Sequence, residues 1–304
     1  MNHWRALDAA GIVDPRLRAS YRACRAVNAA HGRTFYLATT LLPPAKRPAV
    51  HALYGFARRA DEIVDAIDPA LAVEERDRQL TEWTELLLRG AGEDPLMPAV
   101  HDTIMRNNIP LHLFDDFLAS MRMDLTTTEY ATWHDLVVYM QGSAAAIGSE
   151  LLPVLGTVPG SLNEAEPYAR TLGIAFQLTN FIRDVGEDLA RGRVYLPKDD
   201  LAAFGVTTDD LLGGRVDANI RALLAFEISR AHELYHSAEP GIELLHPSSR
   251  DCVRTAFRLY RGILDAVERS GYRVLDRRAK VGLARRLAIA APAWARARRA
   301  RRGR

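Results

Sequence analysis

The sequence predicts one domain built entirely from α-helices, on the basis of three observations. Apolar residues recur every three or four positions through 16–30, 45–67, 71–89, 134–155, 165–191, 214–237 and 247–271. No segment shows the two-residue alternation of a half-buried strand. The breakers between the periodic segments are short, as in "LLPPAK" at 41–46 and "GTVPGSLNE" at 156–164. Short connections place successive helices side by side, so we expect one compact domain and not several domains on linkers.

Composition sets the broad class of protein. The chain has 304 residues, of which 48% are hydrophobic and 26% charged, which is typical of a soluble protein with a large core. A net charge of +2 argues against general binding of nucleic acid. No apolar run reaches the roughly 18 residues of a membrane span, and the first residues lack the apolar centre of a signal peptide. With two cysteines, Cys24 and Cys252, we expect a cytoplasmic protein without disulfides.

The two ends of the chain differ from the centre. We expect an N-terminal extension over 1–15, a catalytic domain over 16–292 and a basic C-terminal tail over 293–304. From Arg277 onward the chain has eleven basic residues and no acid. Such a tail is usually a solvated, frayed end. The alternative is peripheral association with an anionic membrane, worth about 1 kcal/mol for each basic residue held near the surface.

Residues 53–67 form an amphipathic helix with an acidic face. At 100° per residue, Tyr54, Arg58, Asp61 and Asp65 fall within about 60° of one another, beside an apolar arc. This face therefore brings two carboxylates together at i and i+4.

Residues 174–191 repeat that design about 120 residues later. One stripe carries Gln177, Asn180, Asp184, Asp188 and Arg191. Acid pairs at i and i+4 destabilise a helix by about 0.2–0.5 kcal/mol each, and solvated faces normally alternate the sign of charge. Carboxylates gathered in this way suit hard divalent cations such as Mg²⁺ or Mn²⁺. The nearby arginines suit a diphosphate, and they are Arg58, Arg183, Arg191 and Arg193.

Four segments resemble the squalene/phytoene synthase family. "ALYGFARRADEIVD" (52–65) and "QLTNFIRDVGEDLARGRVYLP" (177–197) are similar to the two signature motifs of the family. "YMQGSAAAIGSELLPVLG" (139–156) resembles the segment between them, in the form found in phytoene synthases of the actinobacterial type. "GRTFYLATTLLPPAKR" (32–47) resembles the N-terminal substrate-binding segment.

The resemblance implies a fold and a reaction. The fold is a single-domain isoprenoid synthase-type helical bundle around a central cavity. The reaction is the head-to-head condensation of two geranylgeranyl diphosphates to phytoene through a cyclopropyl intermediate, prephytoene diphosphate, in carotenoid biosynthesis. A prenyl diphosphate is then the substrate, and enzymes of the carotenoid pathway are candidate partners.

The resemblance also implies roles for single residues. It places metal ions on Asp61, Asp65, Asn180, Asp184 and Asp188. Diphosphate contacts would come from Arg58, Arg183 and Arg193, with Gln177, Tyr54, Thr34 and Phe35 lining the substrate site. Tyr139 matches a catalytic tyrosine near the reacting carbons; a buried structural tyrosine is the plainer interpretation. The small residues of 142–146 would permit close helix packing, leave room for an isoprenoid chain, or both.

Three other interpretations compete with this one. A squalene or dehydrosqualene synthase would join two farnesyl diphosphates, and squalene formation would also need NADPH. A scaffold protein on the same fold would be expected to lose the acid pairs, which this chain retains. A zinc protease is suggested by His232-Glu233-Leu234-Tyr235-His236, a short pattern that also arises by chance. We expect both of its histidines to face solvent, without a third ligand.

Overall fold

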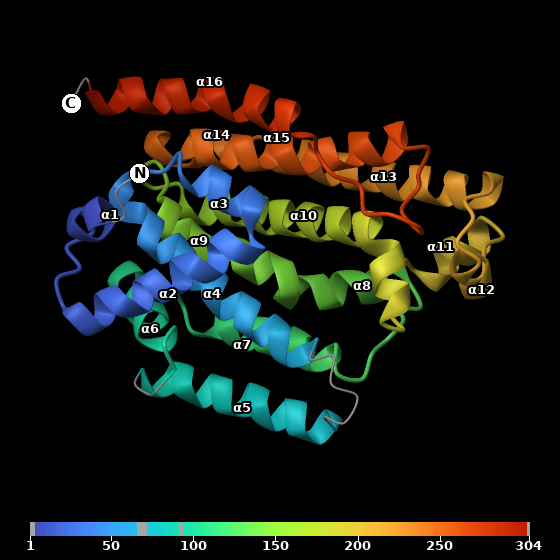
Figure 1. Cartoon of the computed structure of the whole chain (residues 1–304), viewed down its shortest axis with the longest axis horizontal. Coiled ribbons are helices and arrows are strands. Elements are labelled where there is room, and N and C mark those ends of the chain that lie inside the picture. The colour runs from blue at the N-terminus through green and yellow to red at the C-terminus, as the bar shows by residue number, and fades with distance from the viewer. Residues whose placement is uncertain (1–3, 66–71, 91–93, 303–304) are drawn as a thin grey trace.

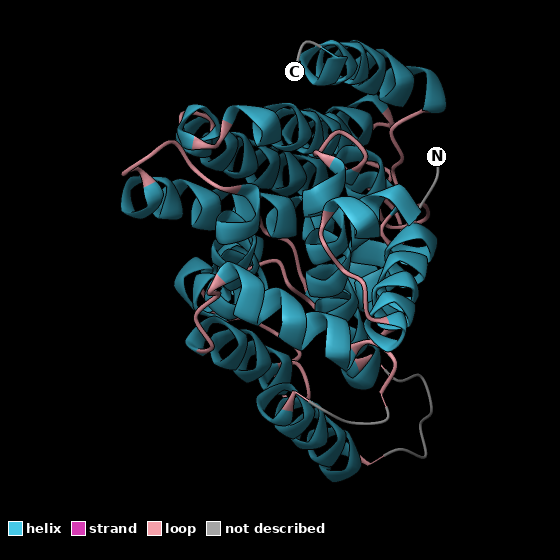
Figure 2. Ribbon diagram, turned by 90° about the vertical axis from the view of Figure 1, so that its left-hand side faces the viewer, coloured by secondary structure: helices cyan, strands magenta, loops and turns pink. Residues whose placement is uncertain are grey.

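A computed structural model describes residues 4–65, 72–90 and 94–302 of the chain. Nearly every element in this part is a helix (Figure 2). Two isolated β-bridges, Glu129–Val194 and Thr157–Leu245, are the extended pairings found in the described residues. The helices are α1 Trp4–Ala9, α2 Pro15–His31, α3 Arg33–Thr39, α4 Arg47–Val64, α5 Val73–Arg89, α6 Met97–Asn107, α7 His112–Met123, α8 Trp133–Met140, α9 Ile147–Leu155, α10 Leu162–Ala190, α11 Lys198–Ala203, α12 Thr208–Leu212, α13 Ala218–Ala238, α14 Gly241–Leu244, α15 Pro247–Arg269 and α16 Leu283–Arg302.

The predicted all-α class is confirmed, and the seven periodic segments correspond to long helices. The segment 134–155 differs, because it divides into α8, a π-helical turn at Gln141–Ala146, and α9. A π-turn inserts an extra residue into the helical ladder and so rotates the faces of the helices on either side. Periodicity overlooked the helices α1, α3, α6, α7, α11, α12, α14 and α16. Five of them, α1, α3, α11, α12 and α14, are too short to present several turns of an apolar stripe.

Helix α10 lies at the centre of the bundle (Figure 1). It packs against α9, the π-helical turn, α13 and α15. One core cluster surrounds α4 in the N-terminal half, and a second surrounds α10 in the C-terminal half. The two helices that carry the acidic faces are thus each embedded in a separate part of the core.

The chain reverses its direction at the C-terminal end of helix α10. Gly192 follows the C-cap residue Arg191 and has a φ of +74°, a left-handed conformation that glycine adopts without steric cost. The chain therefore turns back directly after α10. This turn returns residues 193–197 toward the acidic faces.

Both ends of the chain pack more closely than the sequence suggested. Leu7 and Ile12, in the predicted N-terminal extension, are buried in the core around α4. Helix α16 lies along α15 at the edge of the bundle and runs through the predicted boundary at 292 (Figure 1). Ala290 and Ala293 of α16 are buried. Among the described residues, no helix is long and apolar enough to cross a membrane.

Glu150 of α9 places a carboxyl group inside the core. Its side chain is 1% exposed, and its Oε1 atom has no hydrogen-bond partner in the described structure. Burial raises the pKa of Glu150 from 4.5 to about 8. The group is therefore mainly uncharged at neutral pH, because a low-dielectric interior favours the neutral form.

Glu150→Gln should flatten the pH dependence of stability. Between its unfolded and folded pKa values, the folded chain retains a proton that the unfolded chain releases, so the free energy of unfolding falls as pH rises. The slope contributed by one such group is at most about 1.4 kcal/mol per pH unit. Urea denaturation at about pH 5, 6.5 and 8 measures it, with Glu85→Gln on the exposed face of α5 as control. Parallel curves for wild type and Glu150→Gln would contradict this assignment.

Candidate active site

The acidic face of α4 is formed as predicted. Arg58 donates to Asp61 at 2.7 Å and to Glu62 at 3.0 Å. Asp65 caps the C-terminal end of the helix, and Tyr54 lies half-buried toward its middle. Burial raises the pKa of Tyr54 to about 12, so its hydroxyl keeps its proton and remains a hydrogen-bond donor.

The acidic face of α10 is also formed. Arg183 binds Asp184 through two nitrogens, at 2.7 and 2.5 Å, in bidentate geometry. Asn180 donates to the side chain of Gln177 at 3.4 Å, one turn earlier. Asp188 is partly buried, and no salt bridge or hydrogen bond to its carboxylate is found among the described residues.

Arginines join the two faces. Arg191 and Arg193 both bind Asp65, at 3.0 and 2.6 Å, across more than 120 residues of sequence. The structure therefore brings the predicted aspartates of α4 and α10 to one location. The like-charge repulsion expected along each helix is offset by arginines, most of them from other parts of the chain.

Two carboxylates at this location, Asp61 and Asp188, have raised pKa values. Burial, followed by the charge of Asp65, raises the pKa of Asp61 to about 6. Burial and the charge of Asp184 raise the pKa of Asp188 to about 8. The side chain of Asp61 is still 47% exposed, so ions in solution can reach it. Asp188 has no arginine partner among the described residues, and a divalent cation would supply the missing positive charge.

The residues of the two faces fit a divalent cation. The Oδ1 atom of Asn180 is buried without a hydrogen-bond partner in the described structure, which leaves a neutral oxygen available as a ligand. The carboxylate of Asp188 lies about two helical turns further along the same stripe. The aspartates do not form a compact ligand group, because Asp61, Asp65 and Asp184 are held by arginines. A cation would have to replace part of that pairing.

An apolar cavity of about 220 Å³ opens beside the acidic face of α10. Gln177 and Asn180 belong both to this face and to the cavity wall. From there the wall follows α10 toward its N-terminus, at positions three and four apart. The α10 residues of the wall are Ala165, Tyr168, Ala169, Leu172, Gly173, Phe176, Gln177 and Asn180.

The predicted substrate-binding segment lies on α3, at the same cavity. Phe35 lines the wall and packs against Tyr260, with ring centroids 5.2 Å apart, and against Phe176 at 6.0 Å. Thr34 is half-buried and accepts a hydrogen bond from Arg286 at 3.1 Å. This segment therefore lies beside the cavity, and Thr34 connects it to the C-terminal helix.

The small residues of the π-helical turn serve two purposes. A Cβ atom on Gly142 would lie 2.1 Å from the main-chain oxygen of Asp116 in α7, so only glycine permits this contact. Ser143 and Ala144 line the cavity. Close helix packing is therefore confirmed, and room for an isoprenoid chain beside Ser143 and Ala144 stays a prediction.

Tyr139 is fully buried, and it lies outside the wall of the cavity. Its hydroxyl donates to Asp124 at 2.5 Å, and its ring packs among Tyr130, Phe181 and Tyr195. Burial raises the pKa of Tyr139 well above its ordinary value. Its predicted catalytic role stays a prediction.

Sequence reasoning overlooked two residues of this site. Arg278 binds Asp184 at 2.8 Å and Glu187 at 3.5 Å, so the start of the basic C-terminal segment neutralises the face of α10. Asp124 lies between the tyrosines and Arg193, as described below. Neither residue belongs to a periodic stripe. The signals for Arg278 are the absence of acids after Arg277 and the family resemblance, which places substrate-contacting arginines near the start of that segment.

Comparison with known sequences identifies the family. The sequence profile of squalene/phytoene synthases matches residues 28–285. The chain belongs to the squalene/phytoene synthase family. A phytoene synthase of Arthrospira platensis is 43% identical over 272 residues, covering 86% of this chain and 88% of that protein. A 15-cis-phytoene synthase of Synechocystis sp. is 39% identical over 287 residues, covering 91% and 85%.

Solved structures of family members share this fold. A dehydrosqualene synthase superposes with a TM-score of 0.81 at 30% identity, over 92% of this chain and 97% of that one. A squalene synthase of Alicyclobacillus acidocaldarius gives 0.76 at 29% identity, over 87% and 98%. The family consists of prenyltransferases that depend on divalent metal ions, which agrees with the donor atoms of the two acidic faces.

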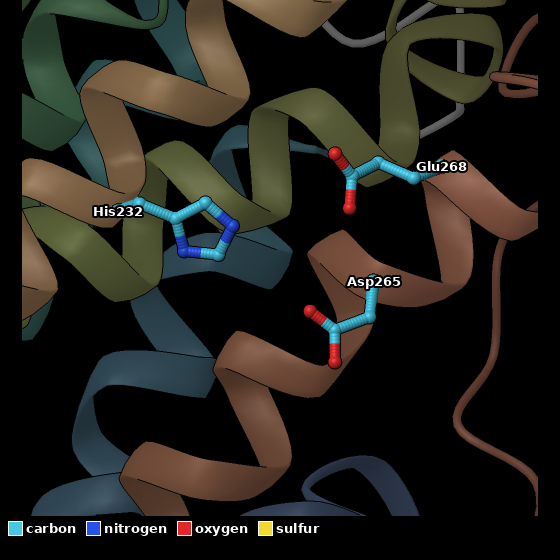
Figure 3. Close-up of side chains that lie close together, drawn as sticks. All are labelled: His232, Asp265 and Glu268. Carbon is cyan, nitrogen blue, oxygen red and sulfur yellow. The ribbon is translucent and has the colours of Figure 1, made fainter.

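The histidine pattern of α13 forms a different arrangement from a zinc-protease site. Glu233 and His236 are exposed, as expected for His236. The prediction that His232 also faces solvent is wrong, because α15 covers that side of α13. The His232 ring faces Asp265 and Glu268 of α15, with one ligand atom from each residue within 4.8 Å of the others (Figure 3). Asp265 is already paired with Arg285.

Replacing both histidines by alanine should leave turnover unchanged. Burial, followed by the charge of Arg261, lowers the pKa of His232, so this side chain is mainly neutral and adds no charge to the acidic faces. We also expect the protein to purify without stoichiometric zinc, because Arg285 competes for Asp265. Elemental analysis of the wild-type protein checks the zinc content, and an activity assay of His232→Ala/His236→Ala checks the turnover. One equivalent of zinc in the wild-type protein, or a loss of activity in the double variant, would restore the zinc-protease interpretation.

Proposed function

We propose that this chain joins two geranylgeranyl diphosphates head to head and forms phytoene through prephytoene diphosphate. One observation carries the proposal. The two acidic faces meet at Asp65, and the same stripe of α10 continues into an apolar cavity at Asn180 and Gln177. Such a site can hold a charged diphosphate at one end and a hydrocarbon chain at the other.

The length of the cavity supports a long prenyl chain. Its wall on α10 extends from Asn180 back to Ala165, which corresponds to about 22 Å at a rise of 1.5 Å per residue. The relatives of Arthrospira and Synechocystis, which carry the name phytoene synthase, favour the C20 substrate over the C15 one.

The arginines of the site would bind the departing diphosphate. Arg58, Arg183 and Arg193 present guanidinium groups whose planar geometry matches phosphate oxygens. Mg²⁺, or Mn²⁺, would be held by Asp61, Asp65, Asn180, Asp184 and Asp188. When bound, such an ion neutralises the diphosphate and improves it as a leaving group. Asp65 would then exchange part of its pairing with Arg191 and Arg193 for the metal.

The cavity would protect the carbocation that remains. Its wall consists almost entirely of apolar side chains, so water is kept away from a cation that it would otherwise quench. Phe35 and Phe176 present aromatic rings to the interior, and aromatic faces stabilise positive charge. Tyr139 would contribute from the aromatic cluster beside the site.

A synthase that joins two farnesyl diphosphates is the second candidate. The observation in its favour is the fold similarity to squalene and dehydrosqualene synthases at about 30% identity. Such an enzyme would use the same acidic faces and arginines. It would differ in how much of the cavity the shorter chain fills, and squalene formation would require NADPH.

Product analysis distinguishes the two candidates. We expect purified protein with Mg²⁺ to convert geranylgeranyl diphosphate to phytoene, with or without NADPH, and to use farnesyl diphosphate poorly.

Asp61→Ala should reduce turnover by about 10³-fold or more, since it removes a metal ligand. Its fold should persist, because Asp61 is partly exposed and its partner Arg58 retains Glu62.

Glu85→Ala on α5 is the matched control, because it also removes a helical carboxylate that pairs with an arginine of the same helix, here Arg89. It should retain wild-type activity. Squalene or dehydrosqualene as the main product would replace the phytoene assignment with the second candidate. Full activity of Asp61→Ala at saturating Mg²⁺ would reject the metal site on α4.

The basic helix α16 would assist peripheral association with anionic membranes, where a C40 hydrocarbon product must be delivered. Leu287 and Trp294 expose apolar surface on this helix. Several of its arginines are already paired with the body of the protein, for example Arg285 with Asp265 and Arg296 with Asp251. Residues 298–302 add four arginines and no acid to this end of the chain.

Replacing Arg298, Arg299, Arg301 and Arg302 by glutamine should weaken binding to anionic liposomes. The four charges account for about 4 kcal/mol at most, and salt screens them beyond about 8–10 Å. Co-sedimentation at low and high salt measures the effect, with neutral liposomes as control. Equal sedimentation of both proteins, or binding that ignores salt and lipid charge, would show that α16 is not a membrane anchor.

A further inference from the structure

Asp124 is a buried carboxylate that belongs to neither acidic face. It caps the C-terminal end of α7 and is 8% exposed. Its Oδ2 atom accepts the hydroxyl of Tyr139 at 2.5 Å, and its Oδ1 atom accepts that of Tyr195 at 3.3 Å. Its main-chain oxygen accepts a hydrogen bond from Arg193 at 3.1 Å. Asp124 thus contacts Tyr139 and two residues of the second signature motif, Arg193 and Tyr195.

Arg193 connects this buried group to the acidic faces. One of its terminal nitrogens donates to Asp65 at 2.6 Å, and the other donates to Asp124. The Arg193 side chain is only 12% exposed, so few water molecules can solvate its charge. The contact with Asp124 goes to its main-chain oxygen, so charge compensation comes from the Asp65 carboxylate and from the nearby charge of the Asp124 carboxylate.

The two partners differ in their access to ions. Asp65 also binds Arg191 and lies among the carboxylates expected to hold the cation. Asp124 lies below them, enclosed by the rings of Tyr130, Tyr139 and Tyr195, which pack against one another. A cation that binds Asp65 weakens its hold on Arg193 but cannot replace Asp124.

The surrounding backbone fixes Asp124 in this position. Ser120 of α7 donates to the main-chain oxygen of Tyr139 at 2.9 Å, which sets the tyrosine over the end of α7. The amide of Val194 donates to Thr128 at 2.8 Å, and that of Lys198 donates to Tyr130 at 3.0 Å. The segment after α10 is thereby aligned with the segment after α7, and Arg193 is aligned with Asp124.

The charge state of Asp124 agrees with this arrangement. Burial raises the pKa of Asp124 to about 6, while the hydrogen bond from Tyr139 and the charge of Arg193 act in the opposite direction. The carboxylate is therefore mostly ionised at neutral pH and can compensate the guanidinium.

We propose that Asp124 is a positioning residue that fixes Arg193 against the diphosphate site while Asp65 engages the cation. The proposal rests on the proposed function in one respect, namely that the site binds a diphosphate. It assigns no chemical step to Asp124. Its role is to keep one arginine oriented, and to hold Tyr139 and Tyr195 in the same hydrogen-bonded group.

A double-mutant cycle between Asp124 and Arg193 tests the proposal. The probe is inorganic diphosphate with Mg²⁺, and its affinity is measured by calorimetry for wild type, Asp124→Asn, Arg193→Ala and the double variant. Asp124→Asn should weaken binding by about 10-fold, or up to about 10²-fold, the loss that follows displacement of a binding group by about 1 Å. In the Arg193→Ala background the same change should have little further effect, because it acts through that arginine.

Glu150→Gln is the matched control, since it alters another buried carboxyl group that contacts none of these residues in the described structure. It should bind diphosphate as wild type does. Equal losses from Asp124→Asn with and without Arg193 would overturn the proposal and leave Asp124 a purely structural residue. Unchanged affinity in a folded Asp124→Asn protein would overturn it as well.

A second variant covers the case in which Asp124→Asn does not fold. Tyr195→Phe removes one hydroxyl from the same carboxylate and keeps the aromatic stack with Phe181, whose ring centroid lies 4.0 Å away. It should weaken diphosphate binding by a few-fold, again only when Arg193 is present. These measurements do not depend on which prenyl chain the enzyme accepts. Phytoene formation by the wild type tests the proposed function separately, so the two can fail independently.

Discussion

Buried and half-buried aspartates need compensating positive charge, and the arrangement of the site follows from that requirement. Asp61, Asp65, Asp184 and Asp188 lie on two helices, and each helix alone would bring like charges together at i and i+4. Arginines that surround them compensate three of the four carboxylates. The fourth, Asp188, has the most strongly raised pKa of the group, at about 8. In the proposed function, a cation and a diphosphate would enter this location together, because each would compensate the partners that the other displaces.

Helix α10 gives the site its two chemical halves. It runs for 29 residues without interruption, with acids and amides in its C-terminal part and small or apolar residues facing the cavity in its N-terminal part. Gln177 and Asn180 mark the change from one part to the other. A rigid helix therefore fixes the distance between the charged end of a ligand and its hydrocarbon end. Loops could not hold that distance as constantly, because they lack the packing that surrounds α10 on several sides.

The π-helical turn at Gln141–Ala146 links this helix to the buried polar group around Asp124. Gly142 allows the turn to approach the backbone of α7, while Ser143 and Ala144 form part of the cavity wall. The same close approach sets Tyr139 above Asp124. The cavity, the tyrosine and the anchored arginine thus share one packing contact, so their positions are not independent of one another.

The sequence by itself determined the helical class, the two acidic faces and the family. These features depend on spacing within a single helix, where 100° per residue already decides which side chains are neighbours. Tyr54, Arg58 and Asp61, or Asn180, Asp184 and Asp188, could be grouped without knowing any other part of the chain. The tertiary structure decided which arginines reach which acids and that Arg278 joins the site. It also decided that His232 turns toward α15 and that Asp124 lies beneath Tyr139. Those contacts join residues that are far apart in sequence, and their geometry is set by how whole helices pack, which no local pattern records.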